Sequence, residues 1–183
     1  MLLMLLADGF EEIEALGTLD LLRRAGVEVQ TTALAEGGSV RGAHGIVVQA
    51  DGAFPGAWTP ERVEGVILPG GMGGATALAA SAQVKTWLRA LDAQGKWICA
   101  ICAAPALVLP RAGVLQAGRR ATCYPAPDFI NALGEAYEAT PAVVSGNLIT
   151  GAGPGAFAAF ARAISEALRP AEVVAQVWQD ALL

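Results

Sequence analysis

The sequence predicts an α/β protein, a three-layer α/β/α sandwich built around a mostly parallel sheet. Short apolar runs of strand length alternate with longer stretches of helical periodicity along the chain, which is typical of strands joined by crossover helices. Several of these runs are apolar on both faces, as expected for strands covered by helices on either side. Of the 183 residues, 54% are hydrophobic and 16% are charged, so we expect residues 1–183 to form a single domain with a large core.

The first expected unit is a strand, a helix and a second strand. Met1–Ala7 is an apolar run, and Asp8-Gly9 forms the turn after it. A helix is expected over Phe10–Ala25, closed by Gly26 and followed by a strand over Val27–Leu34. The apolar stripe expected on the inner face of this helix consists of Phe10, Ile13, Leu16, Leu19, Leu21 and Leu22. Such a unit pairs its two strands in parallel with a right-handed crossover.

The middle of the chain continues the alternation. A hairpin of short strands, Val40–Arg41 and Ile46–Val48, precedes a loop rich in Gly and Pro over Asp51–Pro60. The remaining elements expected here are a buried strand over Val63–Leu68, the glycine-rich segment Pro69–Gly74, helices over Ala75–Ala80 and Ala82–Ala93, a strand over Lys96–Ile101 and a helix that ends at Leu109.

The last third supplies the rest of the sheet and two closing helices. The elements expected there are a short strand over Ala121–Cys123, a short helix over Asp128–Leu133, a pair of strands over Ala142–Ser145 and Asn147–Thr150, the glycine-rich segment Gly151–Gly155, and helices over Ala156–Leu168 and Ala171–Leu182.

Charge and cysteine content exclude several classes of protein. The net charge is −5 and no cluster of Lys and Arg is present, which disfavours nucleic-acid binding. The apolar start of the chain is far too short to span a bilayer, so we expect a cytoplasmic protein that does not enter membranes. Three cysteines give no disulfide framework and are typical of a reducing compartment.

Cys102 lies where a buried strand passes directly into a helix. The junction reads Ala100-Ile-Cys-Ala-Ala-Pro105, and Pro105 suits a first helical turn. A strand-to-helix elbow exposes the nucleophile in hydrolases, and the N-terminal end of a helix favours a thiolate. Two interpretations remain open for Cys102: a reactive nucleophile, or a buried structural cysteine.

Four segments are expected to meet at the carboxyl ends of the strands, where such sheets bind ligands. Among them, Glu14 lies beside the apolar stripe of the first helix, and a carboxyl group buried there would be protonated or paired. Such a group can exchange a proton with a thiol, although simple helix capping explains its neighbours Glu11 and Glu12. Gly70 and Gly71 can offer backbone N–H groups as an oxyanion hole, or form a tight turn that binds nothing.

Other candidate chemistries are weaker. Cys99 precedes Cys102 by three strand residues, a separation of about 10 Å that no disulfide can bridge. Cys123 is interpreted as a structural cysteine. His44 is the only histidine and does not follow the elbow, so nothing supports a Cys–His dyad. No cluster of ligand spacing predicts a metal site.

Five motifs together resemble a known family. They are Ala7–Glu14 (ADGFEEIE), Asp20–Gly26 (DLLRRAG), Leu68–Gly71 (LPGG), Ala100–Pro105 (AICAAP) and Gly153–Gly155 (GPG). Their order is similar to that in the ThiJ/PfpI superfamily, and most closely to the branch of the Parkinson-disease protein DJ-one and its bacterial relatives. The resemblance implies a flavodoxin-like sandwich, a homodimer, a reactive and oxidation-prone Cys102, a protonated Glu14 as its partner, and backbone N–H groups from Gly71 and Ala103.

The resemblance also implies a cofactor-free activity. The substrates would be a small aldehyde, methylglyoxal, converted to lactate, or a glycated protein carrying methylglyoxal adducts. The alternative, from another functional class, is a redox sensor or chaperone whose Cys102 is oxidised to a sulfinate without turnover. A family member with an inert site is a third possibility.

The sequence departs from the family at the rim of the expected site. Tyr124 stands where the resemblance would place a histidine, and Ala152 and His44 stand where it would place arginines. With Cys123 and Pro154 as further candidates for the rim, a polar or anion-binding rim is reduced. Ala103 stands where the protease-like branch carries a histidine, which disfavours that activity.

Overall fold

A seven-stranded sheet in the order β5-β2-β1-β6-β7-β9-β8 forms the middle layer of the molecule. The computed structural model describes all residues 1–183. The strands of this sheet are β1 (Leu2–Leu6), β2 (Val29–Ala33), β5 (Gly52–Ala53), β6 (Gly65–Leu68), β7 (Trp97–Ile101), β8 (Ala142–Ser145) and β9 (Leu148–Gly151). All neighbours pair in parallel except β8, which is antiparallel to β9.

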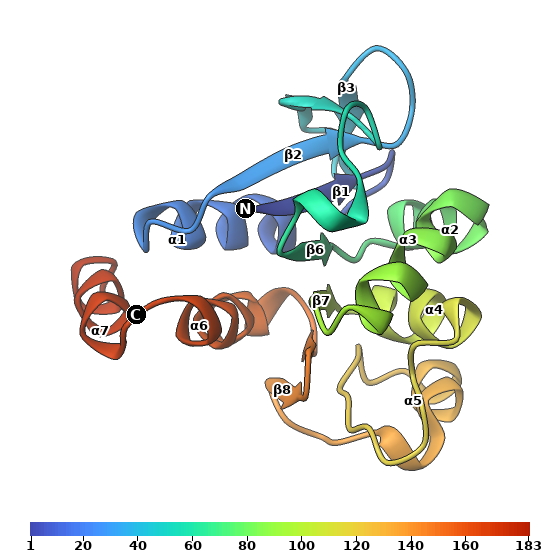
Figure 1. Ribbon diagram of the computed structural model, residues 1–183. Coiled ribbons are helices and arrows are strands. Elements are labelled where there is room, and N and C mark those ends of the chain that lie inside the picture. Colours follow the sequence, from blue (N-terminus) through green and yellow to red (C-terminus); the bar gives the residue numbers. More distant parts are fainter.

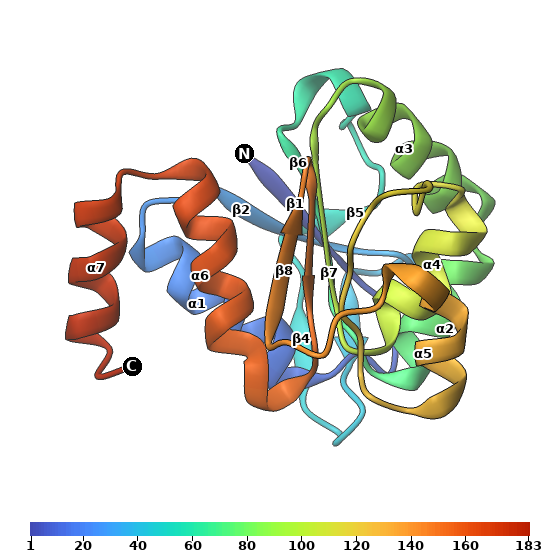
Figure 2. The ribbon, with the colours of Figure 1, turned by 90° about the horizontal axis from the view of Figure 1, so that it is seen from below.

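Helices cover both faces of the sheet (Figures 1 and 2). One layer contains α1 (Thr18–Arg24) and α6 (Phe157–Leu168), with α7 (Ala171–Asp180) packed outside them. The opposite layer contains α2 (Met72–Ala80), α3 (Ala82–Ala93), α4 (Ala103–Ala112) and α5 (Pro127–Leu133). The predicted three-layer α/β/α sandwich with a flavodoxin-like, mostly parallel sheet is therefore confirmed.

The parallel strands are apolar because both faces of the sheet are covered. Every residue of β1 is buried, and so is every residue of β6. Apart from Gly65, they belong to a core of 45 buried residues. None of the helices has the length and hydrophobicity that crossing a membrane requires.

The first helix differs from the prediction. It opens with a π-helical turn over Ile13–Gly17 and becomes an α-helix only at Thr18. Phe10 is not helical because it forms a β-bridge with Gly42. A π turn holds more residues than an α turn, so the side chains are rotated relative to the predicted stripe. Ile13, predicted to face the core, is 53% exposed, while Glu14 is fully buried.

Two further predictions about strands were wrong. The segment Ala121–Cys123 is not a strand and forms only an isolated bridge between Ala121 and Tyr137. Its backbone is satisfied elsewhere, because the Thr122 N–H donates to the Thr150 hydroxyl at 2.8 Å. Conversely, β5 lies within the predicted loop, since Gly52 and Ala53 pair with the end of β2.

The remaining elements lie close to their predicted positions. A separate two-stranded hairpin consists of β3 (Ser39–Arg41) and β4 (Val47–Gln49). Short 3-10 turns cover Pro60–Arg62, Gly134–Ala136 and Pro154–Ala156. The helix α4 begins directly after Cys102 and continues past Leu109, to end at Gly113 in the left-handed conformation, with φ of 75°.

Candidate functional site

Cys102 occupies a strained elbow between β7 and α4. Its φ of 66° and ψ of −112° lie in a region that side-chain-bearing residues rarely adopt. The Cys102 N–H donates to the Gly151 carbonyl, and the Cys102 carbonyl accepts from the Tyr124 N–H, both at 2.9 Å. These two bonds hold a conformation that costs on the order of 1–3 kcal/mol. Strain of this kind is common where a side chain must be presented for chemistry.

Glu14 reaches the elbow from the π-helical turn. Its carboxyl group is fully buried, and Oε2 accepts the Gly70 N–H at 2.8 Å. The other oxygen, Oε1, is buried without a hydrogen-bond partner. Glu11 fixes the turn, because its Oε2 accepts the backbone N–H of Glu14 at 2.7 Å. A buried oxygen without a donor is costly for a carboxylate, so this environment favours the protonated acid.

The proton affinities of the pair follow from this burial. Burial raises the pKa of Glu14 to about 7, and the charge of Glu11 acts in the same direction. Burial also raises the pKa of the Cys102 thiol to about 12, and a negative charge on Glu14 contributes further. When Glu14 carries the proton, that charge is gone and its O–H can donate to sulfur. The two groups therefore titrate as a coupled pair.

The end of α4 acts on the thiol as the sequence indicates, but it is not the dominant influence. Backbone N–H groups of Gly71 and Ala103 lower the pKa of Cys102, whereas burial and Glu14 raise it by more. The expectation that the helix end alone favours the thiolate therefore needs correction. The physical reason is that the sulfur is enclosed, with Cys102 only 9% exposed.

Two positions in the segment after β6 require glycine, because neighbouring groups of the site approach the backbone closely there. A Cβ on Gly70 would overlap the Cβ of Cys102 and Oε2 of Glu14, so Gly70 lies between the two reactive groups. Gly71 has a φ of 82°, and a Cβ there would overlap the backbone of Gly9 and Glu11. Only glycine lets the ends of β1, β6 and β7 approach this closely.

A cavity of about 380 Å³ opens above Cys102. Its lining consists of Glu11, Ala43, His44, Gly71, Met72, Cys102, Ala103, Tyr124, Ala126 and Phe129. Most of this lining is apolar, and Glu11 and His44 are the members that can carry charge beside Cys102. Tyr124 stands over the sulfur together with Gly153, because a Cβ on Gly153 would lie 3.3 Å from the Tyr124 ring and 4.0 Å from Sγ.

Glu12 holds His44 in place through contacts with its backbone and its ring. The Glu12 carboxyl accepts the His44 backbone N–H at 2.7 Å and lies 2.8 Å from Nδ1 of the ring. These bonds lower the pKa of Glu12 and raise the pKa of His44. Ligand atoms of Glu11, Glu12 and His44 lie within 4.8 Å of one another. This grouping could not be read from spacing, and His44 already occupies both Glu12 oxygens.

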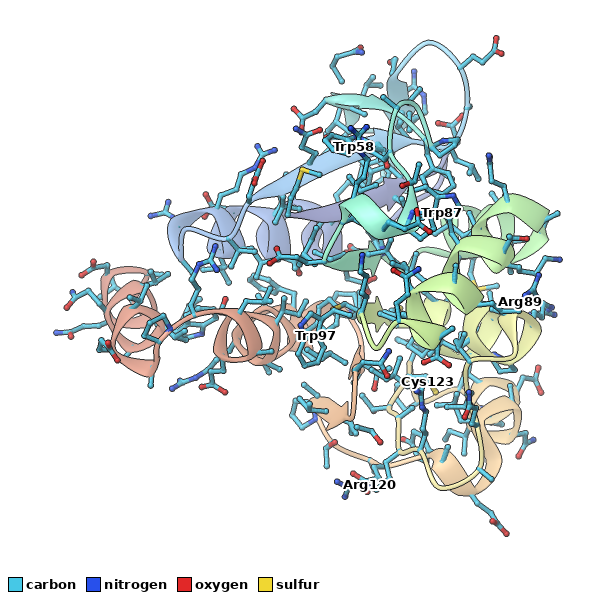
Figure 3. The ribbon with its side chains drawn as sticks, in the orientation of Figure 1. Trp58, Trp87, Arg89, Trp97, Arg120 and Cys123 are labelled. Atoms are coloured by element: carbon cyan, nitrogen blue, oxygen red, sulfur yellow. The ribbon has the colours of Figure 1, made fainter.

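Several predicted site residues do not reach the cavity. Cys123 is fully buried in the segment before α5, and burial raises its pKa to about 11 (Figure 3). Pro154 opens a 3-10 turn and is not among the lining residues. Cys99 is fully buried within β7, and all three cysteines are free thiols. Ala152 is not among the lining residues, and its N–H donates to the Pro141 carbonyl.

Four residues of the cavity wall were not predicted from the sequence. Met72 comes from the start of α2, Ala126 and Phe129 come from α5 and the residue before it, and Ala43 comes from the hairpin loop. Phe129 lies in a predicted helix, so its apolar side chain was visible, but its direction was not. No local pattern marks these residues, because they meet only once the sheet is assembled.

A larger cavity, about 530 Å³, lies near the C-terminal end of α4 and α5. It contains Arg119 and Arg120 but no nucleophile. Arg119 pairs with Asp92 at 2.6 Å and Arg120 pairs with Glu138 at 2.9 Å. Since its cations are already neutralised, the smaller cavity at Cys102 is the better candidate for chemistry.

Comparison with known proteins adds independent information. The sequence pattern of the DJ-1/PfpI family matches residues 1–167. Protein dj-1beta of Drosophila melanogaster is 37% identical over 183 residues, covering 99% of this chain and 96% of the relative. A Pyrococcus abyssi protein named deglycase is 32% identical over 175 residues, covering 91% and 98%.

Solved structures agree with the fold. The structure described as Toxoplasma gondii DJ-1, oxidized, superimposes with a TM-score of 0.91 at 34% sequence identity. The match covers 99% of this chain and 97% of the other. The likeness therefore extends from β1 to the last helix and includes the elbow that carries Cys102.

Proposed function

The chain belongs to the DJ-1/PfpI family, and on that premise we propose that it is a cofactor-free cysteine enzyme of carbonyl-stress defence. Its substrate would be methylglyoxal or the adducts that methylglyoxal forms on proteins. The observation that carries this proposal is the pairing of Glu14, with a pKa raised to about 7, with a thiol on a strained elbow. The relative named deglycase supports the same reaction class.

The first step is addition of sulfur to the aldehyde. As the sulfur of Cys102 attacks the aldehyde carbon and forms a C–S bond, the thiol proton passes to the Glu14 carboxylate. Glu14 then gives this proton to the carbonyl oxygen, which completes a hemithioacetal. Glu14 is the acid closest to the sulfur. Backbone N–H groups of Gly71 and Ala103, which already stabilise negative charge on Cys102, lie where they can also stabilise charge on oxygen.

The second step moves hydrogen within the bound substrate. Glu14, now a carboxylate, removes the proton from the former aldehyde carbon and returns it to the neighbouring carbon through an enediol. The product is a thioester of a 2-hydroxy acid. Water then attacks the thioester, the C–S bond breaks, and lactate and one proton leave while Cys102 is restored as a thiol. One water is consumed, and no external oxidant or reductant is needed.

The direct test is lactate formation from methylglyoxal by the purified protein without added thiol or cofactor. We expect Cys102→Ser to abolish lactate formation and Glu14→Gln to lower kcat by about 10²–10⁴-fold, as is typical of a lost general acid or base. Cys99→Ala, which alters a buried strand cysteine away from the cavity, is the matched control. Full activity in Cys102→Ser would disprove the proposal.

A second function is favoured by one observation. The N–H groups at the sulfur, together with a protonated Glu14, suit an anionic cysteine sulfinate as well as a thiolate. Peroxide would oxidise the thiolate to a sulfenate, and a second peroxide would give the sulfinate, with one water released at each step. In this alternative the protein is a redox sensor or chaperone. Stoichiometric oxidation of Cys102 without lactate formation would support it, and a thiol that resists mild peroxide would exclude it.

We also propose a homodimer in the cytoplasm. Ile13, Ile46 and Val47 are all about half exposed, and the bridge between Phe10 and Gly42 joins the segment of Ile13 to the hairpin. An apolar face of this kind favours a protein partner. Three free cysteines are typical of a reducing compartment.

A further inference from the structure

The wall of the cavity at Cys102 is more apolar than a small, polar substrate needs. Met72 and Tyr124, each about half exposed, line this wall together with Phe129 of α5. Ala43 and Ala126 add further apolar surface to the same wall. Methylglyoxal offers this wall only one methyl group, so most of the apolar surface would remain in contact with water.

The volume of the cavity leads to the same conclusion. Taking about 30 Å³ for each water-sized group, methylglyoxal with its five heavy atoms fills at most about 150 Å³. An aryl oxoaldehyde with ten heavy atoms fills about 300 Å³ by the same rule. The cavity holds about 380 Å³, so the larger molecule uses the available space and the smaller one does not.

Charge around the cavity disfavours anionic ligands. Neither Lys nor Arg is among the lining residues, whereas Glu11 is. The second acid, Glu12, lies directly below and is bound to His44, the one residue of the lining that can carry positive charge. Arg41, on the same hairpin, donates to the Gly45 carbonyl at 3.3 Å. A carboxylate or phosphate on the substrate would find no free cation.

We propose that this site selects neutral α-oxoaldehydes that carry an aryl or branched alkyl group, in preference to methylglyoxal and to anionic aldehydes. This inference rests on the proposed function and specifies its substrate class. The aldehyde carbon meets Sγ of Cys102, and the apolar group lies against Met72, Tyr124 and Phe129. The chemistry is unchanged, so phenylglyoxal and one water give mandelate.

The test compares three substrates with the purified wild-type protein: methylglyoxal, phenylglyoxal and 4-carboxyphenylglyoxal. Each methylene in an apolar pocket changes kcat/KM by about 10–200-fold. We therefore expect phenylglyoxal to exceed methylglyoxal at least tenfold in kcat/KM. The two aryl substrates differ only in the added carboxylate. We expect kcat/KM for 4-carboxyphenylglyoxal to be at least tenfold lower than kcat/KM for phenylglyoxal.

Variants separate pocket binding from the intrinsic reactivity of the aldehydes. Phe129→Ala should lower the ratio of kcat/KM for phenylglyoxal to that for methylglyoxal. Met72→Gln, at a position 58% exposed and therefore tolerant of change, should lower the same ratio. Val173→Ala, on the outer helix α7, should leave the ratio unchanged.

The outcomes are distinct. Turnover of methylglyoxal without a preference for phenylglyoxal overturns the substrate assignment and leaves the proposed function intact. Equal rates for the two aryl substrates overturn the argument from charge. If none of the three aldehydes is converted, the proposed function fails and this inference fails with it.

Discussion

At the scale of one residue, the burial of Glu14 raises its pKa and thereby lowers the free energy of unfolding at neutral and higher pH. A carboxyl group with a pKa of about 7 in the folded chain, against 4.5 without perturbation, binds its proton more tightly when folded. The free energy of unfolding therefore decreases as pH rises from 4.5 to 7 and is constant above that range. At about 1.4 kcal/mol for each pKa unit, the burial of Glu14 costs roughly 3 kcal/mol at pH 8.

We expect Glu14→Gln to be more stable than the wild type at pH 8, by up to roughly 3 kcal/mol by the same reasoning. The advantage should shrink through pH 7 to 4.5 and vanish below pH 4.5, where Glu14 is protonated in both states. Urea unfolding of both proteins at pH 4, 6 and 8 measures the difference. A constant difference across this range would contradict a raised pKa at Glu14.

Glu12→Gln is a control with the opposite sign. The pKa of Glu12 is lowered by its hydrogen bonds to His44, so its contribution to stability is present at neutral pH and lost on acidification. We expect Glu12→Gln to be less stable than the wild type at pH 7, with the gap closing toward low pH. The two substitutions remove the same charge from neighbouring positions, so only their environments differ.

Single residues were predictable where the chain itself supplies the constraint. The elbow at Cys102 follows from a strand that runs directly into a helix. Glu14 was singled out by its place beside the apolar stripe, but its full burial comes from the π-helical turn. The cavity wall was not predictable, because Ala43, Met72 and Phe129 come from three distant elements. Their directions depend on packing that no local pattern records.

At the scale of elements, the π-helical turn before α1 is the feature that the sequence did not predict. Regular helical periodicity placed Ile13 in the core, yet Ile13 is exposed and Glu14 is buried. The parallel strands were predictable because a sheet covered on both faces leaves continuous apolar runs. The π turn leaves no such signal, since it depends on the bridge between Phe10 and Gly42 and on contacts with α6.

In that turn, Gly17 lies against Phe157 of α6. A Cβ on Gly17 would lie 2.7 Å from Cε2 of Phe157, so the Phe157 ring would have to move. Overpacking costs about 1–3 kcal/mol, and the better helix propensity of alanine returns about 1 kcal/mol. We therefore expect Gly17→Ala to lower the free energy of unfolding by up to about 2 kcal/mol.

Two further variants make this measurement specific. The double variant Gly17→Ala/Phe157→Leu should lose less free energy of unfolding than the two single variants lose together. The reason is that the shorter side chain at position 157 gives room for the added methyl group. Gly155→Ala, where no atom lies within 4 Å of the added Cβ, should leave stability nearly unchanged. Additive effects in the double variant would mean that Gly17 does not act through Phe157.

At the scale of the whole molecule, several large apolar side chains remain exposed, three of them on the hairpin and the segment that it contacts. The β3–β4 hairpin and the segment before α1 lie side by side (Figure 2). They expose Ile13 at 53%, Ile46 at 52% and Val47 at 49%. The same hairpin loop carries Ala43 and His44 into the cavity, so a partner on this face would adjoin the proposed active site.

We expect the wild type to sediment as a dimer and Ile13→Asp to shift it toward the monomer, raising the dissociation constant at least tenfold. A carboxylate at the centre of an apolar contact loses its hydration without gaining a partner. Val173→Asp, which places the same charge on the exposed surface of α7, should remain dimeric. Analytical ultracentrifugation across a range of concentrations gives both constants. A monomeric wild type would exclude the dimer, while a dimer unaffected by Ile13→Asp would place its interface on another face of the molecule.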